Sequence, residues 1–244
     1  MFNFGFDKRI LYIIIGILVV SSLMSMGTGG ILGLLFTLPG VLLAITFHEF
    51  AHAYAADKLG DDTPRMQGRL NLNPTSHIDP FGFFMLLFAH IGWGKPVQIN
   101  PRNFNRDISM DKGQAIVSFA GPLMNFILAI VLSLVYCMIY KFAGYAFITT
   151  TVGEVILTII SYSIVVNVGL GVFNLIPLPP LDGSKILKNF LPYNAKYWFE
   201  QNEQIFYIVF IVIWITGIAG NIISPIIDWV TSGILTLALN IFGL

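Results

Sequence analysis

Residues 31–56 read I-L-G-L-L-F-T-L-P-G-V-L-L-A-I-T-F-H-E-F-A-H-A-Y-A-A. This run is long and apolar enough to cross a bilayer as a helix, yet it contains His48, Glu49 and His52. On a helix, two histidines four residues apart lie on one face and can bind one metal ion, while the glutamate beside them is a candidate general base. Ionisable groups inside a membrane are costly and therefore indicate a functional site. The stretch predicts a metal site embedded in the membrane.

The composition supports a membrane environment for the whole chain. Hydrophobic residues make up 56% of the 244 residues, charged residues make up 11%, and the mean hydropathy is +0.79. These values are far from those of a soluble domain and predict an integral membrane protein. The single cysteine, Cys137, excludes an internal disulfide. The net charge of zero gives no indication of nucleic-acid binding.

The hydropathy pattern predicts an all-α polytopic membrane protein with six transmembrane helices. The candidate spans are residues 10–26, 31–56, 115–142, 155–176, 205–220 and 221–244. The fifth span is short, and Pro225 and Asp228 interrupt the sixth, so the ends of this final hairpin are poorly defined. The first run follows Lys8 and Arg9 as a signal peptide would, but no A-x-A-like cleavage site follows it. We interpret it as an uncleaved anchor.

The loop between the second and third spans predicts the orientation of the chain. Its apolar run at residues 81–93 is too short to cross and is expected to be re-entrant or interfacial, with a lid over the site as a less favoured reading. If it does not cross, every Lys and Arg except Lys141 falls on one side of the membrane. The positive-inside rule then predicts that both termini are cytoplasmic. The alternating pieces at residues 68–72 and 95–99 predict short strands in the same loop.

Two histidines need a third protein ligand to form a catalytic zinc site, which leaves its fourth position to water. The candidates are His77, Asp79, His90 and Asp182. Asp182 is favoured because it ends the run N-L-I-P-L-P-P-L-D-G at residues 174–183, where prolines break the fourth span. This break is expected at about the membrane depth of His52. Two histidines and one carboxylate fit zinc and the hydrolysis of an amide bond.

Two amide side chains are expected at the same depth. Asn125, in the run A-G-P-L-M-N at residues 120–125, and Asn174 could donate hydrogen bonds to a developing oxyanion. For Asn125 the alternative is an interhelical hydrogen bond, made possible by the close approach that Gly121 allows. His77 and His90 are expected to make local hydrogen bonds rather than to bind metal.

These motifs, in this order, resemble the site-2 protease family of intramembrane zinc metalloproteases. The resemblance covers about residues 31–187, and the run R-L-N-L-N-P-T-S-H-I-D-P-F-G at residues 69–82 is similar to the compact prokaryotic branch without PDZ or CBS domains. It implies one zinc ion on His48, His52 and Asp182. It also implies Glu49 as the base that acts with zinc-activated water, and Asn125 and Asn174 as supports for the substrate or the transition state.

The same resemblance implies where the protein acts and on what. The substrate would be the transmembrane helix of another membrane protein, cut within or near that helix at the cytoplasmic face of the cell membrane in regulated intramembrane proteolysis. Residues 1–244 would form one domain, with a catalytic core at about 31–187 and peripheral helices at 10–26 and 205–244. A regulatory membrane partner or a homo-oligomer remains open.

Two other functions are compatible with a membrane metal site. A metal transporter would need polar residues along a path to the outer face, and spans two to four offer few beyond Asn125, Asn167 and Asn174. An inactive relative acting as a scaffold would be expected to lose a ligand or the base, whereas all of these residues are present.

Overall fold

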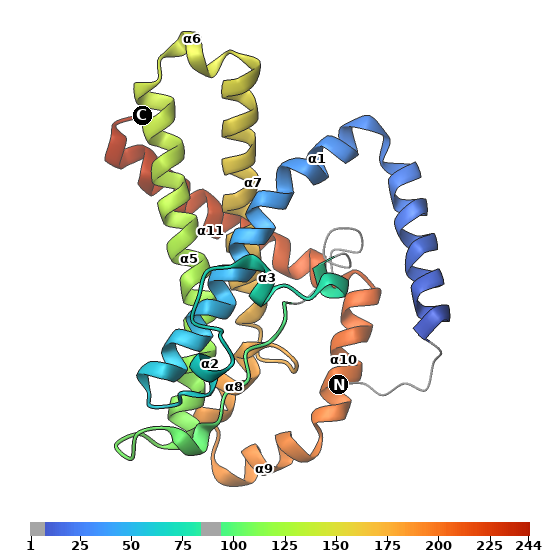
Figure 1. Ribbon diagram of the computed structural model, residues 1–244, viewed down its shortest axis with the longest axis vertical. Coiled ribbons are helices and arrows are strands. Elements are labelled where there is room, and N and C mark those ends of the chain that lie inside the picture. The colour runs from blue at the N-terminus through green and yellow to red at the C-terminus, as the bar shows by residue number, and fades with distance from the viewer. Residues whose placement is uncertain (1–7, 84–93) are drawn as a thin grey trace.

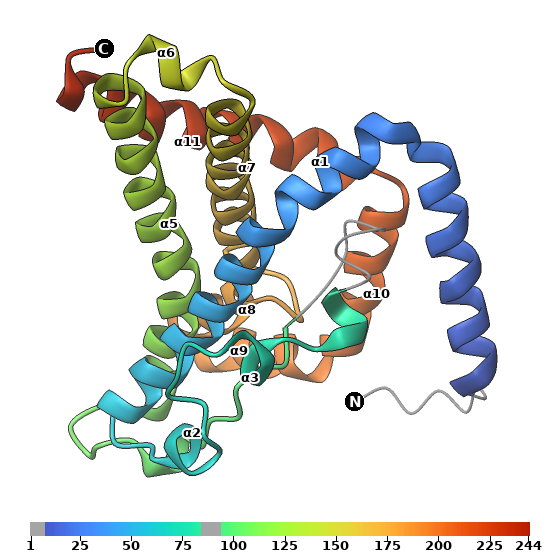
Figure 2. The same ribbon diagram turned by 45° about the horizontal axis from the view of Figure 1, so that its top comes forward.

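The computed structural model describes residues 8–83 and 94–244, with side chains from residue 30 onward apart from residue 215. Within these ranges the regular structure is helical, which confirms the all-α prediction. The helices labelled in Figures 1 and 2, together with the short 3-10 helix η1, are α1 (Lys8–Lys58), α2 (Thr63–Met66), α3 (Pro74–His77), η1 (Pro101–Asn103), α5 (Met110–Phe142), α6 (Tyr145–Ile148), α7 (Thr151–Asn174), α8 (Asp182–Phe190), α9 (Tyr193–Gln201), α10 (Glu203–Ile215) and α11 (Ile218–Phe242).

The centre of the molecule is formed by the C-terminal part of α1 together with α5 and α7, which lie side by side (Figure 1). Small residues allow these helices to approach closely. A Cβ atom placed on Gly40 of α1 would lie 2.7 Å from the Cα atom of Ser163 of α7, and one on Gly171 would lie 3.0 Å from the ring of Phe126. Lipid tails are as apolar as leucine, so helices in a membrane associate mainly through such close packing.

Four helices are long and apolar enough to cross a bilayer in the part of the chain whose side chains are described. They are Gly30–Lys58 within α1, Met110–Phe142, Thr151–Asn174 and Ile218–Phe242. They contain the predicted spans at 31–56 and 115–142 and most of those at 155–176 and 221–244. The predicted first span, residues 10–26, belongs to the N-terminal part of α1, whose ribbon bends sharply before the C-terminal part (Figure 1). Helix α10 has 13 residues and rises only about 20 Å, less than the hydrocarbon thickness of about 30 Å.

The prediction of a final hairpin at residues 205–244 is wrong. Helix α9 lies beside the start of α5, where Lys196 Nζ is 2.5 Å from Asp111 Oδ1. The C-terminal end of α11 lies beside the C-terminal end of α5, where Lys141 Nζ donates to the carbonyl of Phe242. Helix α11 therefore ends beside the C-terminal end of α5, and the C-terminus lies at the end of the bundle opposite α9. The prediction that both termini are cytoplasmic concerns sides of a membrane and stays a prediction, but a single crossing by α10 and α11 together would put the C-terminus on the side opposite α9.

The short strands predicted at residues 68–72 and 95–99 do not form. In the described part of this loop the only bridge is an isolated antiparallel pair between Ile78 and Gly94. Backbone groups bond to side chains instead of a ladder, and the amide of Asn100 donates to Asp61 Oδ2 at 2.6 Å. The predicted re-entrant run at residues 81–93 lies mostly outside the described residues.

Asp61 is the centre of this loop and is fully buried. Its carboxylate accepts hydrogen bonds from Thr63 Oγ1 at 2.5 Å and from Asn103 Nδ2 at 2.9 Å, in addition to the bond from Asn100. Burial alone would raise the pKa of Asp61, but these hydrogen bonds outweigh it and hold the pKa below its ordinary value. The loop is therefore fixed to the C-terminal end of α1 by an ionised aspartate.

Candidate active site

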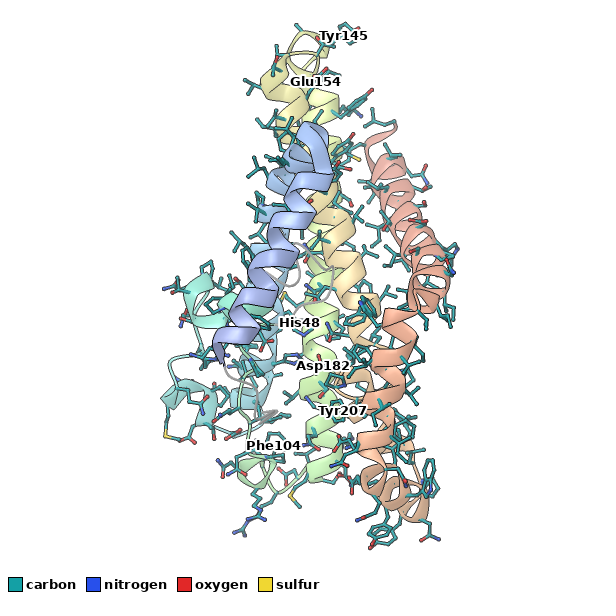
Figure 3. The ribbon with its side chains drawn as sticks, turned by 90° about the vertical axis from the view of Figure 1, so that its right-hand side faces the viewer. His48, Phe104, Tyr145, Glu154, Asp182 and Tyr207 are labelled. Carbon is teal, nitrogen blue, oxygen red and sulfur yellow. The ribbon has the colours of Figure 1, made fainter. Side chains whose placement is uncertain are left out.

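His48 and His52 lie on one face of the last turns of α1, where both are buried at 6% and 9% exposure. Their Nε2 atoms are 3.0 Å apart. Figure 3 shows His48 and Asp182 between the end of the bundle marked by Tyr145 and the end marked by Phe104, nearer to the latter. The helical spacing expected from the sequence therefore brings both imidazoles to one point.

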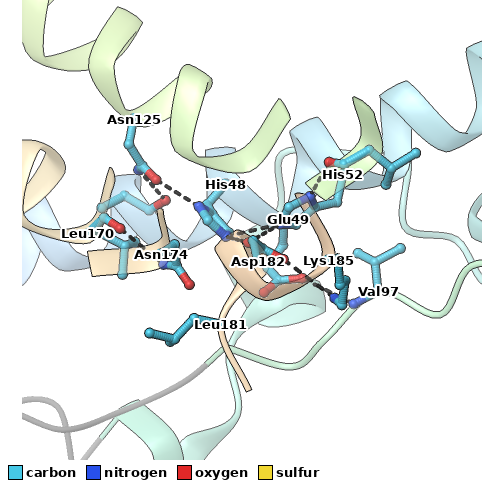
Figure 4. A network of polar contacts seen from close by, with 12 residues as sticks. His48, Glu49, His52, Val97, Asn125, Leu170, Asn174, Leu181, Asp182 and Lys185 are labelled. Carbon is cyan, nitrogen blue, oxygen red and sulfur yellow. Dashed lines mark hydrogen bonds and ion pairs between the residues drawn. The ribbon is translucent and has the colours of Figure 1, made fainter. Parts of the chain in front are cut away.

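Asp182 is the first residue of α8 and joins the two histidines from another part of the chain. Its Oδ2 atom is 3.2 Å from His48 Nε2 and 3.0 Å from His52 Nε2, as Figure 4 shows. The following glycine makes this placement possible, since a Cβ atom on Gly183 would lie 2.3 Å from the carbonyl oxygen of Leu175. The start of α8 packs directly on the backbone of the turn that ends α7.

The hydrogen bonds of the imidazoles show which nitrogen atoms are free to bind metal. His48 Nδ1 donates to Asn125 Oδ1 at 2.7 Å, and His52 Nδ1 donates to the carbonyl oxygen of Val117 at 2.7 Å. Because both acceptors are carbonyl oxygens, each Nδ1 atom carries a proton. Both Nε2 atoms then present lone pairs toward the carboxylate of Asp182.

The three facing donor atoms fit zinc. His48, His52 and Asp182 are all buried and form a group whose ligand atoms lie within 4.8 Å of one another. Three buried electron-pair donors without a hydrogen atom between them repel one another unless they share a cation. Tetrahedral zinc with bonds of about 2.0–2.1 Å would separate its ligand atoms by about 3.3 Å, close to the 3.0 and 3.2 Å separations found here.

Helix α5 supports the two histidines through the motif at residues 121–125. A Cβ atom on Gly121 would lie 2.5 Å from His52 Nε2 and 2.7 Å from His48 Cε1. Only glycine therefore lets the backbone of α5 lie against the imidazole rings. One helical turn later, Asn125 reaches the Nδ1 atom of His48.

Asn125 is fully buried, and its amide group is completely used within the bundle. Its Nδ2 atom donates to the carbonyl of Ala44 at 3.1 Å and to Asn167 Oδ1 at 3.1 Å. Asn125 therefore makes the interhelical hydrogen bonds that were the alternative prediction, and its contact with Nδ1 also orients His48. Asn174 lies nearby (Figure 4) and donates from Nδ2 to the carbonyl of Leu170 at 3.0 Å. Direct contact of either amide with a substrate stays a prediction.

Glu49 is half-buried and faces a different set of neighbours from those of the histidines. Its Oε2 atom accepts a hydrogen bond from the backbone amide of Val97 at 3.0 Å. Its Oε1 atom lies against Gly94, where an added Cβ atom would be 3.1 Å away. No pattern in the sequence predicts this contact between the candidate base and the loop.

The other candidate ligands are not in the cluster. His77 is buried, and its Nε2 atom donates to the carbonyl of Asn71 at 2.7 Å. Asp79 Oδ1 accepts from the backbone amide of Gly82 at 2.7 Å, which is a local turn interaction. His90 lies outside the described residues.

Two further residues support the site but were not predicted to belong to it. The carbonyl of Val117 orients His52, and Asn167 supports Asn125. A backbone carbonyl has no signal in the sequence. Asn167 does have one, because it lies seven residues before Asn174 on α7 and so on the same helical face.

Comparisons with known proteins identify a family for the chain. Residues 36–217 match peptidase family M50. The chain is 37% identical to "Putative zinc metalloprotease YwhC" of Bacillus subtilis over 204 residues, which covers 83% of this chain and 90% of the relative. It is 26% identical to "Putative zinc metalloprotease Rip2" of Mycolicibacterium smegmatis over 198 residues, covering 80% of this chain and 72% of the relative. No solved structure shows significant similarity.

The family match covers most of the chain and includes His48, Glu49, His52 and Asp182. The donor set of the buried cluster is one that zinc prefers. The chain therefore belongs to peptidase family M50, the site-2 protease family, and is a zinc metalloendopeptidase.

Proposed function

We propose that this protein is an intramembrane zinc endopeptidase that cuts a peptide bond within or near the transmembrane helix of another membrane protein. The observation that carries the proposal is the buried cluster of His48, His52 and Asp182, with Glu49 next to it, on helices long and apolar enough to cross a bilayer. Such a site is suited to substrates that are themselves in the membrane, and regulated intramembrane proteolysis is its expected role.

The residues divide the chemistry among them. Zinc held by His48, His52 and Asp182 would supply a Lewis acid that polarises the scissile carbonyl and makes a water molecule more acidic. Glu49 accepts the proton of the attacking water and returns it to the leaving amine. Asn125 keeps His48 in the tautomer that presents Nε2, and Asn174 is the nearby amide that supports the substrate.

The substrate helix must open before it can be cut. The amides of a helix are bonded to one another and closed to attack, so we expect helix-breaking residues near the cleavage site.

We propose that the site faces the cytoplasmic side of the cell membrane. The loop and helix ends around the site carry most of the basic residues, whereas Lys141 lies at the opposite end of α5 beside Phe242. The positive-inside rule assigns the end rich in Lys and Arg to the cytoplasm. The N-terminus would also be cytoplasmic, with residues 10–26 as a further crossing, and the C-terminus would lie on the other side.

We also propose that residues 1–244 act as one domain, with its catalytic core at about residues 31–187. The segment at residues 81–93 would associate with the membrane without crossing it. Helices α1, α5, α7 and α8 supply the ligands and their supports, while α10 and α11 lie at the periphery.

The test replaces Glu49 with Gln and measures cleavage of a defined transmembrane substrate together with bound zinc. We expect zinc to remain at one per chain and cleavage to fall by about 10²- to 10⁴-fold, the usual contribution of a general base. An unchanged cleavage rate with zinc still bound would remove Glu49 from the mechanism.

A metal transporter or an inactive scaffold has less support. Beyond the metal cluster, the buried amides of Asn125 and Asn167 bond to each other and to backbone carbonyls, so they do not line a path for ions. Metal flux into vesicles that is independent of Glu49 would favour transport instead.

A further inference from the structure

Residues 94–97, called the strap below, lie directly against the catalytic helix. The strap touches α1 at Glu49, where the amide of Val97 donates to Oε2 at 3.0 Å. A Cβ atom on Gly94 would lie 2.9 Å from Ile45 Cγ2 and 3.1 Å from Glu49 Oε1. There is therefore no room between the strap and the helix for a larger residue at this position.

The strap is held by two further backbone contacts, both at Lys95. Its amide donates to the carbonyl of His77 at 2.7 Å. Its carbonyl accepts a hydrogen bond from Nη2 of Arg69. The backbone groups of Lys95 thus bond to the loop, while the amide of Val97, two residues later, bonds to α1.

Arg69 is unusual because it is a buried cation at 4% exposure. Its Nη1 atom has no hydrogen-bond partner in the part of the chain that the structure describes. Burial lowers the pKa of the guanidinium group, and the negative charge of nearby Glu49 opposes this effect. Burying a charge is costly unless it is compensated, and the compensation here comes from the strap carbonyl and from Glu49.

We propose that Arg69 is a positioning residue for proteolysis, which holds the strap against α1 so that the Val97 amide fixes the carboxylate of Glu49. The inference rests on the proposed function, because it requires Glu49 to be the base. The hydrogen bond from Val97 to Oε2 sets the orientation of the carboxylate. Arg69 does not touch the reacting atoms and acts through Lys95, Val97 and Glu49.

The experiment compares two changes at Arg69 with a matched control. Arg69→Met removes the charge and the donor but keeps most of the volume, whereas Arg69→Lys keeps one cationic donor. Arg65→Met removes another arginine from the same loop, one that pairs with Asp57 and is exposed. Each full-length protein is assayed for kcat and KM on a transmembrane substrate and for bound zinc.

We expect Arg69→Met to lower kcat by about 10- to 100-fold, as expected when a catalytic group is displaced by about 1 Å. KM should stay within about twofold and zinc should remain at one per chain, because the substrate contacts and the metal ligands are untouched. Arg69→Lys should recover most of the lost kcat, and Arg65→Met should behave as the wild type. A wild-type kcat in Arg69→Met overturns the proposal, as does an equal loss in Arg65→Met.

A second variant decides the question if Arg69→Met no longer binds zinc. Gly94→Ala leaves the guanidinium in place and pushes the strap away from Glu49, so we expect the same loss of kcat with zinc retained. A wild-type kcat in Gly94→Ala overturns the proposal. The wild type and Glu49→Gln separate the two hypotheses. A wild type that does not cut the transmembrane substrate removes the proposed function, and full activity in Glu49→Gln removes Glu49 as the base. An inactive Glu49→Gln beside a fully active Arg69→Met removes only the role of Arg69.

Discussion

The two halves of the site are held in different ways. The proposed metal ligands are fixed by helices, since α5 supplies Gly121, Asn125 and the carbonyl of Val117 to the histidines of α1. The carboxylate of Glu49 is fixed by a loop, through the amide of Val97. Loss of a helix contact should therefore affect metal binding, whereas loss of a loop contact should affect the rate of the chemical step.

The largest effect is expected from the ligand that joins α8 to α1. Asp182→Ala leaves two histidines without the carboxylate that completes the set, so both bound zinc and cleavage should fall to background. Stoichiometric zinc measurement coupled to a cleavage assay in the same detergent checks this. The control is Asp228→Ala, which removes an exposed carboxylate on α11. Retention of a full zinc complement in Asp182→Ala would show that another residue is the third ligand.

The next effect is expected on the base alone. Glu49→Asp shortens the side chain by one methylene group, which withdraws the carboxylate from the Val97 amide and from the reacting water. We expect kcat to fall by about 100-fold with zinc unchanged. Glu154→Asp, at the far end of α7 (Figure 3), makes the same chemical change away from the site. A loss of zinc in Glu49→Asp would show that metal binding depends on Glu49 as well as on the buried cluster.

A smaller effect is expected on the helix support. Asn125→Leu keeps the volume but removes the acceptor for His48 Nδ1, so the imidazole is free to rotate and change tautomer. Removal of such a support usually weakens metal binding by about 10- to 100-fold. Competition with a zinc chelator measures the affinity. Asn221→Leu, exposed on α11, is the control, and an unchanged affinity in Asn125→Leu would show that His48 is held by other contacts.

The smallest effect is expected on the stability of the loop. Asp61→Asn replaces a carboxylate, which only accepts hydrogen bonds, by an amide that faces four donors. The free energy of unfolding should therefore fall by about 1–3 kcal/mol. The pKa of Asp61 is lowered in the folded protein. The difference in free energy of unfolding between wild type and variant should be largest above a pH of about 4, the ordinary pKa of an aspartate. It should vanish as the pH falls through the lower pKa of Asp61 in the folded protein.

Thermal unfolding in detergent across this pH range checks the Asp61 prediction, and zinc content should not change. Asp62→Asn, at an exposed neighbouring position, is the control. A difference that stays constant down to acidic pH would show that the charge of Asp61 is not what holds the loop.

The buried cluster of His48, His52 and Asp182 could be predicted from the sequence because local geometry brings these residues together. The helical spacing of His48 and His52 puts them on one face, and the prolines before Asp182 end α7 near their depth. The support of His48 by Asn125 was also open to prediction, as the interhelical alternative.

The rest depends on contacts that leave no pattern in the chain. The carbonyl of Val117 and the amide of Val97 are backbone groups, which every residue has. The direction of α11 was missed for another reason. Residues 203–244 contain no Lys or Arg, so the positive-inside rule has nothing to act on there, and packing against α5 and α7 decides the direction instead.

The side chain of Asn125 connects three helices at once, since its amide contacts His48 and Ala44 of α1 and Asn167 of α7 while it belongs to α5. The imidazole that receives metal is therefore set only when these three helices have come together in the membrane. A newly made or partly inserted chain would have the ligands in its sequence but no hydrolytic centre. Assembly of the three helices is therefore a condition for ordering the imidazole of His48.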